Sequence, residues 1–334
     1  MINFSTLVNT SVKGTETPYS IKSTGRLVMS VLFIISSFVG NTLVLLAIYR
    51  FQRLRTISNM IIANLSLTDV LFSVFVAPIN AFYWSQADLL PSAIPCHVSG
   101  VGAILFGLCS IYTLVFVSIE RFLATNYPLR HRNSFGVKAV KYGLVTVWIW
   151  SGVLCAIAFG ISRYTYIDSF FHCIPDWGNS LLYTLGILFS GNVIPLVILI
   201  YCNVRVLKII HRRRKIQTKP ESAGSIQTHN AHHQREKRVS LIIVAVISIF
   251  IFCWTPYSTA MICLAVDGCA LPKEFMSAAV VMTISNGSFN PIIYGVMNKN
   301  FRAAFAAIIG YTKETQERNR VRDFAADIKD VSML

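Results

Sequence analysis

Charge is scarce in this sequence. Of its 334 residues only 13% are Asp, Glu, Lys or Arg, whereas 54% are hydrophobic. Soluble domains carry about 25% charged residues, so this composition argues against a soluble globular protein. The hydrophobic residues gather in runs that reach the roughly 20 residues a helix needs to cross a bilayer. We place seven predicted spans at residues 27–49, 57–83, 98–122, 142–161, 181–206, 239–266 and 275–297.

The predicted fold is therefore all-α, a seven-transmembrane helix bundle that occupies residues 27–297. An extracellular tail at 1–26 precedes it. A short amphipathic cytoplasmic helix at 298–310 and a cytoplasmic tail at 311–334 follow it. A chain organised in this way is expected to be a multi-pass protein of the plasma membrane, in contact with membrane lipids.

Acidic residues are half as numerous as basic ones, 15 against 30, which gives a formal net charge of +15. A basic excess can serve nucleic-acid binding, but here the basic residues concentrate in the loops at 50–56, 123–141 and 207–238. The alternate loops contain almost no basic residues, and loops rich in Lys and Arg stay in the cytoplasm. The amino terminus is therefore predicted outside the cell, the carboxyl terminus inside, and no nucleic-acid partner is expected. Sequons at Asn3 and Asn9 predict glycosylation of the outer tail.

Cys109, Cys155, Cys202 and Cys253 fall inside predicted spans, where a small buried side chain is the ordinary interpretation. Cys96 stands at the head of the third span and Cys173 in the loop after the fourth. Both are on the predicted oxidising side, so we expect a disulfide between them. A second bridge between Cys263 and Cys269 is left open.

Charges are almost absent from the interior of the spans, and Asp69 is the one that we find deep in a span. A transporter or pump needs a series of charges along its pore, so a membrane transporter is kept only as a distant alternative. The sequence also lacks HExxH and similar paired ligand spacings. We therefore expect neither a membrane hydrolase nor any other enzyme, and no metal site built on such paired ligands.

Polar residues interrupt the seventh predicted span, VVMTISNGSFNPIIYGVMNK at 280–299. Lipid satisfies no amide or hydroxyl, so these side chains must face partners inside the protein. Pro291 breaks the helical hydrogen-bond ladder at the same place. This stretch is predicted to form the inner wall of a polar cavity.

Most predicted spans carry a polar or kinking residue, and the set forms a joint pattern. Asn41 and Asp69 lie in the first two spans, and the third runs from Cys96 to Glu120-Arg121-Phe122. The remaining members are Trp148 or Trp150, Pro195, Trp254 and Pro256, and finally Asn290, Pro291 and Tyr294. With this pattern the chain resembles the class A, rhodopsin-like G protein-coupled receptors over about residues 25–310.

The resemblance implies a receptor that binds an extracellular or membrane-derived ligand and activates heterotrimeric G proteins by outward movement of span six. Arrestin is a further implied partner. Arg121 would be restrained by Glu120 and by Glu236, although a glutamate in this loop could equally be solvated. The implied activation switch comprises Glu120, Arg121, Glu236, Pro195, Ile111, Phe250, Trp254, Pro256, Pro291 and Tyr294. The family's usual tyrosine eight residues after Pro195 is Asn203 here, whose shorter side chain would have to reach Tyr294.

The resemblance also implies a water-filled sodium pocket beneath Trp254. Its residues would be Asp69, Ser110, Asn286 and Asn290, with Asn41 in the same polar network. Carboxylate, hydroxyl and amide oxygens suit a hard cation. A hydrated polar network without an ion is the alternative. No other cofactor is expected.

The sequence excludes two classes of ligand but does not identify the ligand. The amine-receptor aspartate is Ala103 here, and the retinal-binding lysine of opsins is Ile284, so covalent retinal is not expected. The loop 162–177 nevertheless resembles the opsin loop that folds as a hairpin over the pocket, and the end of span seven resembles opsins and melatonin receptors. An opsin-like protein with a non-covalent chromophore or ligand-independent signalling is the alternative. The expected pocket is apolar and suits a neutral ligand; it comprises Ser99, Ala103, Phe106, Gly107, Trp254, Tyr257 and Ile284.

Overall fold

The computed structural model describes residues 21–85, 93–161, 164–167, 172–175, 181–217, 226–265, 269 and 271–310. The predicted glycosylation sites Asn3 and Asn9 lie outside these residues. The long elements are α2 (Ile21–Arg50), α3 (Ile57–Phe75), α5 (Ala93–Asn126), α7 (Val137–Ile161), α9 (Ile194–Gln217), α10 (Ile226–Ala265) and α11 (Lys273–Met297). The shorter ones are η1 (Gln52–Leu54), α4 (Ala77–Ser85), α6 (Pro128–Ser134), β1 (Tyr164–Ile167), β2 (His172–Pro175), α8 (Leu181–Leu188), η3 (Phe189–Val193) and α12 (Lys299–Ile309).

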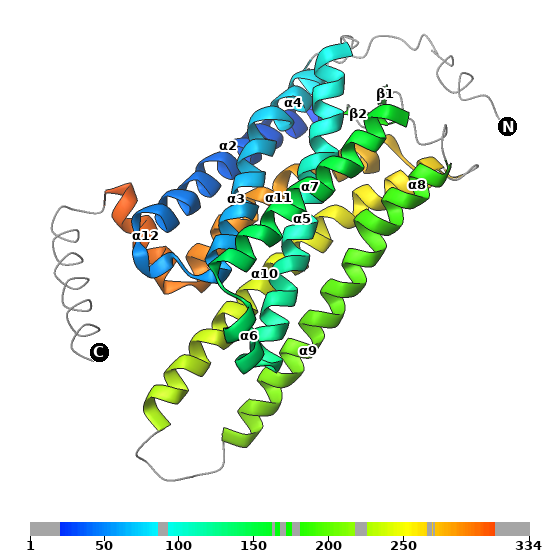
Figure 1. The fold of residues 1–334 in the computed structure, drawn as a ribbon. Coiled ribbons are helices and arrows are strands. Elements are labelled where there is room, and N and C mark those ends of the chain that lie inside the picture. The colour runs from blue at the N-terminus through cyan, green and yellow to red at the C-terminus, as the bar shows by residue number, and fades with distance from the viewer. Residues whose placement is uncertain are drawn as a thin grey trace, which may run out of the picture.

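The long helices run side by side as one bundle (Figure 1). Helix α11 packs between α2 and α10, and α5 contacts α3, α7 and α9. The two strands lie at one end, called here the hairpin end, and α6 lies at the other, called the α6 end (Figure 1). Within the described residues six segments are long and apolar enough to cross a membrane: Gly25–Arg50, Ile57–Tyr83, Ile94–Asn126, Val137–Ile157, Leu185–Arg212 and Arg238–Leu264. Helix α11, with 25 residues, is the seventh helix of the bundle.

The second predicted span is broken about two thirds of the way along its length. Helix α3 ends at Phe75, and α4 begins at Ala77 with Pro78 as its second residue. Proline has no amide hydrogen, and its ring clashes with the carbonyl four residues earlier. The amide of Asn80 resumes the hydrogen bonding by donating to the carbonyl of Val76 at 3.3 Å. This break sets the direction of α4 at the hairpin end, where Asn80 lines a pocket.

The fifth predicted span contains one turn of π-helix, η3, between α8 and α9. The amide of Ile194 donates to the carbonyl of Phe189, five residues earlier. Pro195, the next residue, has no amide to donate, which favours an irregular turn just before it. The hydroxyl of Tyr112 on α5 donates to the Ser190 carbonyl within this turn at 3.0 Å. The π turn adds a residue to the helix and places Asn192 in the wall of the same pocket.

The largest hydrophobic core occupies the half of the bundle toward the α6 end. Buried side chains from eight α-helices meet there, among them Ile61, Leu114, Leu199, Val246 and Tyr294. Outward-facing aliphatic and aromatic residues are widely exposed on the same helices, as expected for surfaces that meet lipid rather than water.

Helix α12 follows α11 after a cap at Asn298, whose side-chain oxygen accepts from the amide of Asn300 at 3.0 Å. Its buried Phe301 stacks on Tyr294 with ring centroids 5.6 Å apart. This contact fixes the start of α12 to the end of α11.

Candidate functional site

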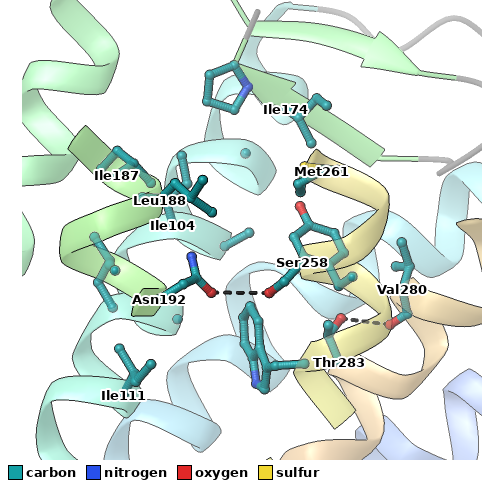
Figure 2. Close-up of a pocket in the computed structure, with 18 of the residues that line it drawn as sticks. Ile104, Ile111, Ile174, Ile187, Leu188, Asn192, Ser258, Met261, Val280 and Thr283 are labelled. Atoms are coloured by element: carbon teal, nitrogen blue, oxygen red, sulfur yellow. Dashed lines mark hydrogen bonds between the residues drawn. The ribbon is translucent and has the colours of Figure 1, made fainter. Parts of the chain in front are cut away.

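A pocket of about 280 Å³ lies inside the bundle beneath β2. Figure 2 shows side chains converging on it from α5, η3, α10 and α11, with Ile174 of β2 above them. Its lining is almost entirely apolar and includes no Asp, Glu, Lys or Arg from the described residues. A cavity of this kind suits a small molecule held by shape and a few hydrogen bonds.

The hairpin covers the pocket from the hairpin end. Strands β1 and β2 pair antiparallel, with Tyr166 opposite Cys173. Cys173 is disulfide-bonded to Cys96 of α5, which pins β2 to the bundle and places Ile174 and Pro175 in the pocket wall. These are the hairpin and the bridge expected from the sequence. Cys263 and Cys269 form a second disulfide, which the sequence left open.

Of the pocket residues expected from the sequence, Ala103, Gly107, Trp254 and Tyr257 line the cavity. Phe106 and Ile284 line a smaller cavity next to it instead. Ser99 is buried and donates to the side-chain oxygen of Asn80 at 2.7 Å. Phe106 and Ile284 were therefore assigned to the wrong cavity. Neighbouring residues of one helix point in different directions, so they can line different cavities.

The sequence analysis missed the polar residues of this pocket. The Ser258 hydroxyl donates to the Asn192 side-chain oxygen at 3.1 Å, which joins α10 to the π turn (Figure 2). Thr283 also lines the pocket and donates to the carbonyl of Val280 at 2.8 Å. Asn192 and Ser258 could have been noticed in the sequence as polar residues close to span prolines. Asn192 lies three positions before Pro195, and Ser258 lies two positions after Pro256.

The smaller cavity is the polar one expected around the seventh span. It offers about 20 Å³ of space for the centre of a water molecule, enough for one ordered water. Asp69, Ser110 and Asn286 line it. The Asn290 amide, buried beside it, donates to the Asp69 carboxylate at 2.8 Å.

Two further contacts close this polar network. The Asn41 amide donates to the carbonyl of Gly287 at 2.8 Å. A Cβ atom on Gly287 would lie 2.4 Å from the Ser37 hydroxyl and 3.2 Å from the Asp69 side chain, so a glycine is required for α11 to approach this closely. The side-chain oxygen of Asn290 is buried and has no hydrogen-bond partner among the described residues.

Trp254 lies between the two cavities and contributes to the wall of both. Its ring stacks on Phe250 with centroids 5.5 Å apart and meets Tyr257 edge-on at 6.0 Å. A Cβ atom on Gly107 would come within 2.9 Å of the indole. Glycine at this position of α5 therefore lets the indole pack against the helix backbone.

Glu120, buried at the α6 end, is the centre of a polar cluster. Its side chain is 0% exposed and is ion-paired with Arg121, whose side chain is 13% exposed. The Arg121 Nε donates to the carboxylate at 2.5 Å. His131 Nε2 lies 3.0 Å from the same carboxylate, and the Ser58 hydroxyl lies 3.4 Å from it.

The pairing of Glu120 with Arg121 is therefore present, but the sequence analysis missed His131, which helix α6 brings to it. The signal was Pro128, which favours the first turn of a helix and opens α6. His131 stacks on Phe135, with centroids 5.3 Å apart. Glu236 lies on α10, and its side chain falls outside the described residues, so its pairing with Arg121 stays a prediction.

Comparison with known proteins identifies the family. The family model described as "7 transmembrane receptor (rhodopsin family)" matches residues 40–294, more than half of the chain. The chain belongs to this family. Its relatives include the histamine H2 receptor of Canis lupus familiaris, which is 28% identical over 288 residues and aligns with 84% of this chain and 78% of that receptor. The red-sensitive opsin-2 of Danio rerio is 28% identical over 315 residues, covering 90% of this chain and 83% of the opsin.

The structure of squid rhodopsin has the same fold, with a TM-score of 0.79, 20% sequence identity and coverage of 92% of both chains. The protein is thus a rhodopsin-family G protein-coupled receptor and a multi-pass membrane protein, and not an enzyme. Receptors of this family couple to heterotrimeric G proteins and respond to a ligand.

This receptor departs from family patterns at particular residues. Asn203 donates to the Leu199 carbonyl at 2.7 Å and to Ser118 on α5 at 3.3 Å, whereas Tyr294 is buried against Phe301. The structure has no hydrogen bond between Asn203 and Tyr294, in line with the short reach of the asparagine side chain. Ala103 and Ile284 place a methyl and an aliphatic group where amine receptors and opsins have an aspartate and a lysine.

Proposed function

We propose that this receptor binds an extracellular or membrane-derived ligand in the pocket beneath β2 and activates heterotrimeric G proteins through outward movement of α10. The observation that carries the proposal is the position of Trp254, one side of which faces the pocket and the other the polar cavity. A ligand that shifts this indole acts on both cavities and on α10 itself.

The path from pocket to α10 runs through packed side chains. Phe250, stacked on Trp254, and Ile111 of α5 both reach the pocket floor and the central core. Pro256 interrupts the α10 hydrogen-bond ladder two residues beyond Trp254, which makes it a natural pivot. We expect Pro195, just after the π turn, and Pro291 to permit the matching adjustments of α9 and α11.

At the α6 end the Glu120–Arg121 pair is the restraint that activation would release. Arg121 is partly exposed while Glu120 is fully buried, so the arginine can turn outward and the glutamate cannot. The released guanidinium would contact the G protein. The basic loops support an orientation with the α6 end in the cytoplasm and the hairpin end outside, in the plasma membrane, with arrestin as a second cytoplasmic partner.

The polar cavity fits a sodium ion in the inactive receptor. Asp69 supplies a buried carboxylate, Ser110 and Asn286 line the same space, and the Asn290 oxygen lacks a partner among the described residues. Several oxygen donors around a negative charge match the needs of a hard cation. Bound there, sodium would hold the polar network together beneath Trp254.

The test is nucleotide exchange by purified G proteins of each class, with the full-length receptor in lipid nanodiscs. We expect at least one class to exchange GDP faster with the receptor than with empty nanodiscs. Arg121→Ala should remove the effect without lowering the amount of folded receptor. Exchange that equals the empty-disc rate for every class, or that survives Arg121→Ala, would contradict the proposal.

A second candidate function rests on the hairpin cover, because β2 closes the pocket from the hairpin end. An opsin-like protein with a non-covalent chromophore, or one signalling without a ligand, would use such a closed pocket. Absorbance of the purified receptor above the protein band, and light dependence of exchange, separate this candidate from a ligand-gated receptor.

A further inference from the structure

Two residues of the pocket lining, one on α8 and one on α10, are more exposed than the rest. Leu185 of α8 and Ile262 of α10 are 39% and 45% exposed, whereas the other lining residues are buried or partly buried. These two aliphatic side chains are therefore the candidates for the thinnest part of the wall.

Both residues lie in segments that are apolar enough to cross a membrane. Leu185 and Ile262 fall inside the apolar segments Leu185–Arg212 and Arg238–Leu264, near the ends that lie toward the hairpin. Exposed side chains change rotamer on the picosecond to nanosecond scale, so these two can open a passage without movement of a helix. The passage would lead into the bilayer at the depth of one leaflet.

The hairpin end offers no comparable passage in the described part of the pocket. Cys173, Ile174 and Pro175 of β2 are buried and form part of its wall. The Cys96–Cys173 disulfide ties this strand to α5. A ligand that entered from water past β2 would have to displace a covalently anchored strand.

The lining restricts the chemistry of the ligand. Among the described residues no side chain of the lining is charged, and burying an ion without a partner is unfavourable. Asn192 offers the best-placed polar group, because its oxygen accepts from Ser258 while its amide nitrogen has no hydrogen-bond partner among the described residues. In Figure 2 this nitrogen points away from Ser258, toward the end of the pocket under β2.

We propose that the ligand is an uncharged, mostly apolar molecule that enters from the bilayer between Leu185 and Ile262, and that one of its oxygen atoms accepts a hydrogen bond from Asn192. This inference rests on the proposed function in that it concerns the same pocket, but binding can be measured without a G protein.

The chemistry is tested with a medium-chain ketone that carries a photoreactive diazirine. The matched probes are the alkane, the carboxylate and the ammonium compound of the same chain, each loaded equally into nanodiscs with the full-length receptor. Mass spectrometry then locates the labelled peptides. We expect the ketone to label the pocket at least about tenfold more than either charged probe, and about two- to tenfold more than the alkane.

Asn192→Leu keeps the approximate size of the side chain but removes its donor. It should abolish the preference for ketone over alkane and leave alkane labelling in place. Pocket labelling by a charged probe equal to that by the ketone would overturn the proposal. So would a ketone preference that survives Asn192→Leu.

The route is tested by the rate of alkane labelling after probe-loaded vesicles are mixed with the receptor. Leu185→Ala with Ile262→Ala opens the wall and should raise the rate several-fold, whereas Leu185→Trp with Ile262→Trp should lower it. Phe189→Trp is the matched control, since Phe189 is exposed on the same surface but does not line the pocket. A rate that neither wall variant changes would show that the ligand enters elsewhere.

The two proposals fail separately. Selective labelling of a receptor that catalyses no exchange would refute the G protein proposal alone. Exchange catalysed by a receptor whose pocket takes the charged probes as readily would refute the ligand proposal alone.

Discussion

Replacing Glu120 with glutamine should release the arginine of the switch and raise signalling without a ligand. The carboxylate is fully buried and holds Arg121 through two N–H groups, with His131 and Ser58 as further neighbours. Glutamine has nearly the same shape but no charge and only one accepting oxygen. The substitution therefore removes the charge while disturbing the packing little.

The size of the effect follows from these contacts. A hydrogen bond to a charged group contributes about 1.5–3 kcal/mol and a neutral one about 0.5–1.5 kcal/mol. Glutamine can accept only one of the two bonds from Arg121, so the loss of the other bond costs the restrained state about 1.5–3 kcal/mol. Since 1.4 kcal/mol is a tenfold change in an equilibrium, the ratio of active to inactive receptor should rise about 10- to 150-fold.

The assay is basal nucleotide exchange at equal receptor density, with a melting curve for each variant to establish that it is folded. Ser58→Ala is the matched control, because the hydroxyl of Ser58 is uncharged and 3.4 Å from the carboxylate; it should change the basal rate less than about threefold. His131→Gln should give an intermediate increase, since glutamine keeps a donor. Basal exchange by Glu120→Gln that equals that of Ser58→Ala would refute the reasoning.

Three further predictions concern the other sites. Sodium at 100 times its dissociation constant should stabilise the receptor by about 2.7 kcal/mol, seen as a higher melting temperature than in a bulky organic cation, and Asp69→Asn should abolish the difference. Incubation with retinal followed by borohydride reduction should leave no retinyl adduct in the bundle, because Ile284 has no amine; a stable adduct found by mass spectrometry would contradict this. Glu236→Ala should raise basal exchange if Glu236 helps to restrain Arg121, and an unchanged rate would leave Glu120 as the restraint.

The fold class could be predicted because it depends on composition and on long apolar segments, which lipid requires of any spanning helix. The irregular parts were harder. Pro78 and Pro195 are visible in the sequence, but proline can kink, end or bulge a helix. Only packing decided that Pro78 separates α3 from α4 and that a π turn precedes Pro195.

The candidate sites were also predictable only in part, where local sequence was enough to bring the residues together. Glu120 and Arg121 are neighbours in the chain, so their pairing needed no tertiary information. Asn192 and Ser258 lie on different helices, 66 residues apart, and their contact depends on how the π turn rotates one helix relative to the other. His131 was missed for a related reason, because nothing local shows that α6 folds back onto α5.

The central claim is that α10 moves outward at the α6 end when the receptor engages a G protein. Spin labels on Lys141→Cys of α7 and Arg238→Cys of α10, both exposed positions, would report the distance between these helices by pulsed electron resonance in nanodiscs. The four free native cysteines are buried and should label poorly. The account predicts that a nucleotide-free G protein shifts the distance distribution to longer values, and that Arg121→Ala weakens the shift. Unchanged distributions while the wild-type receptor catalyses exchange would contradict it.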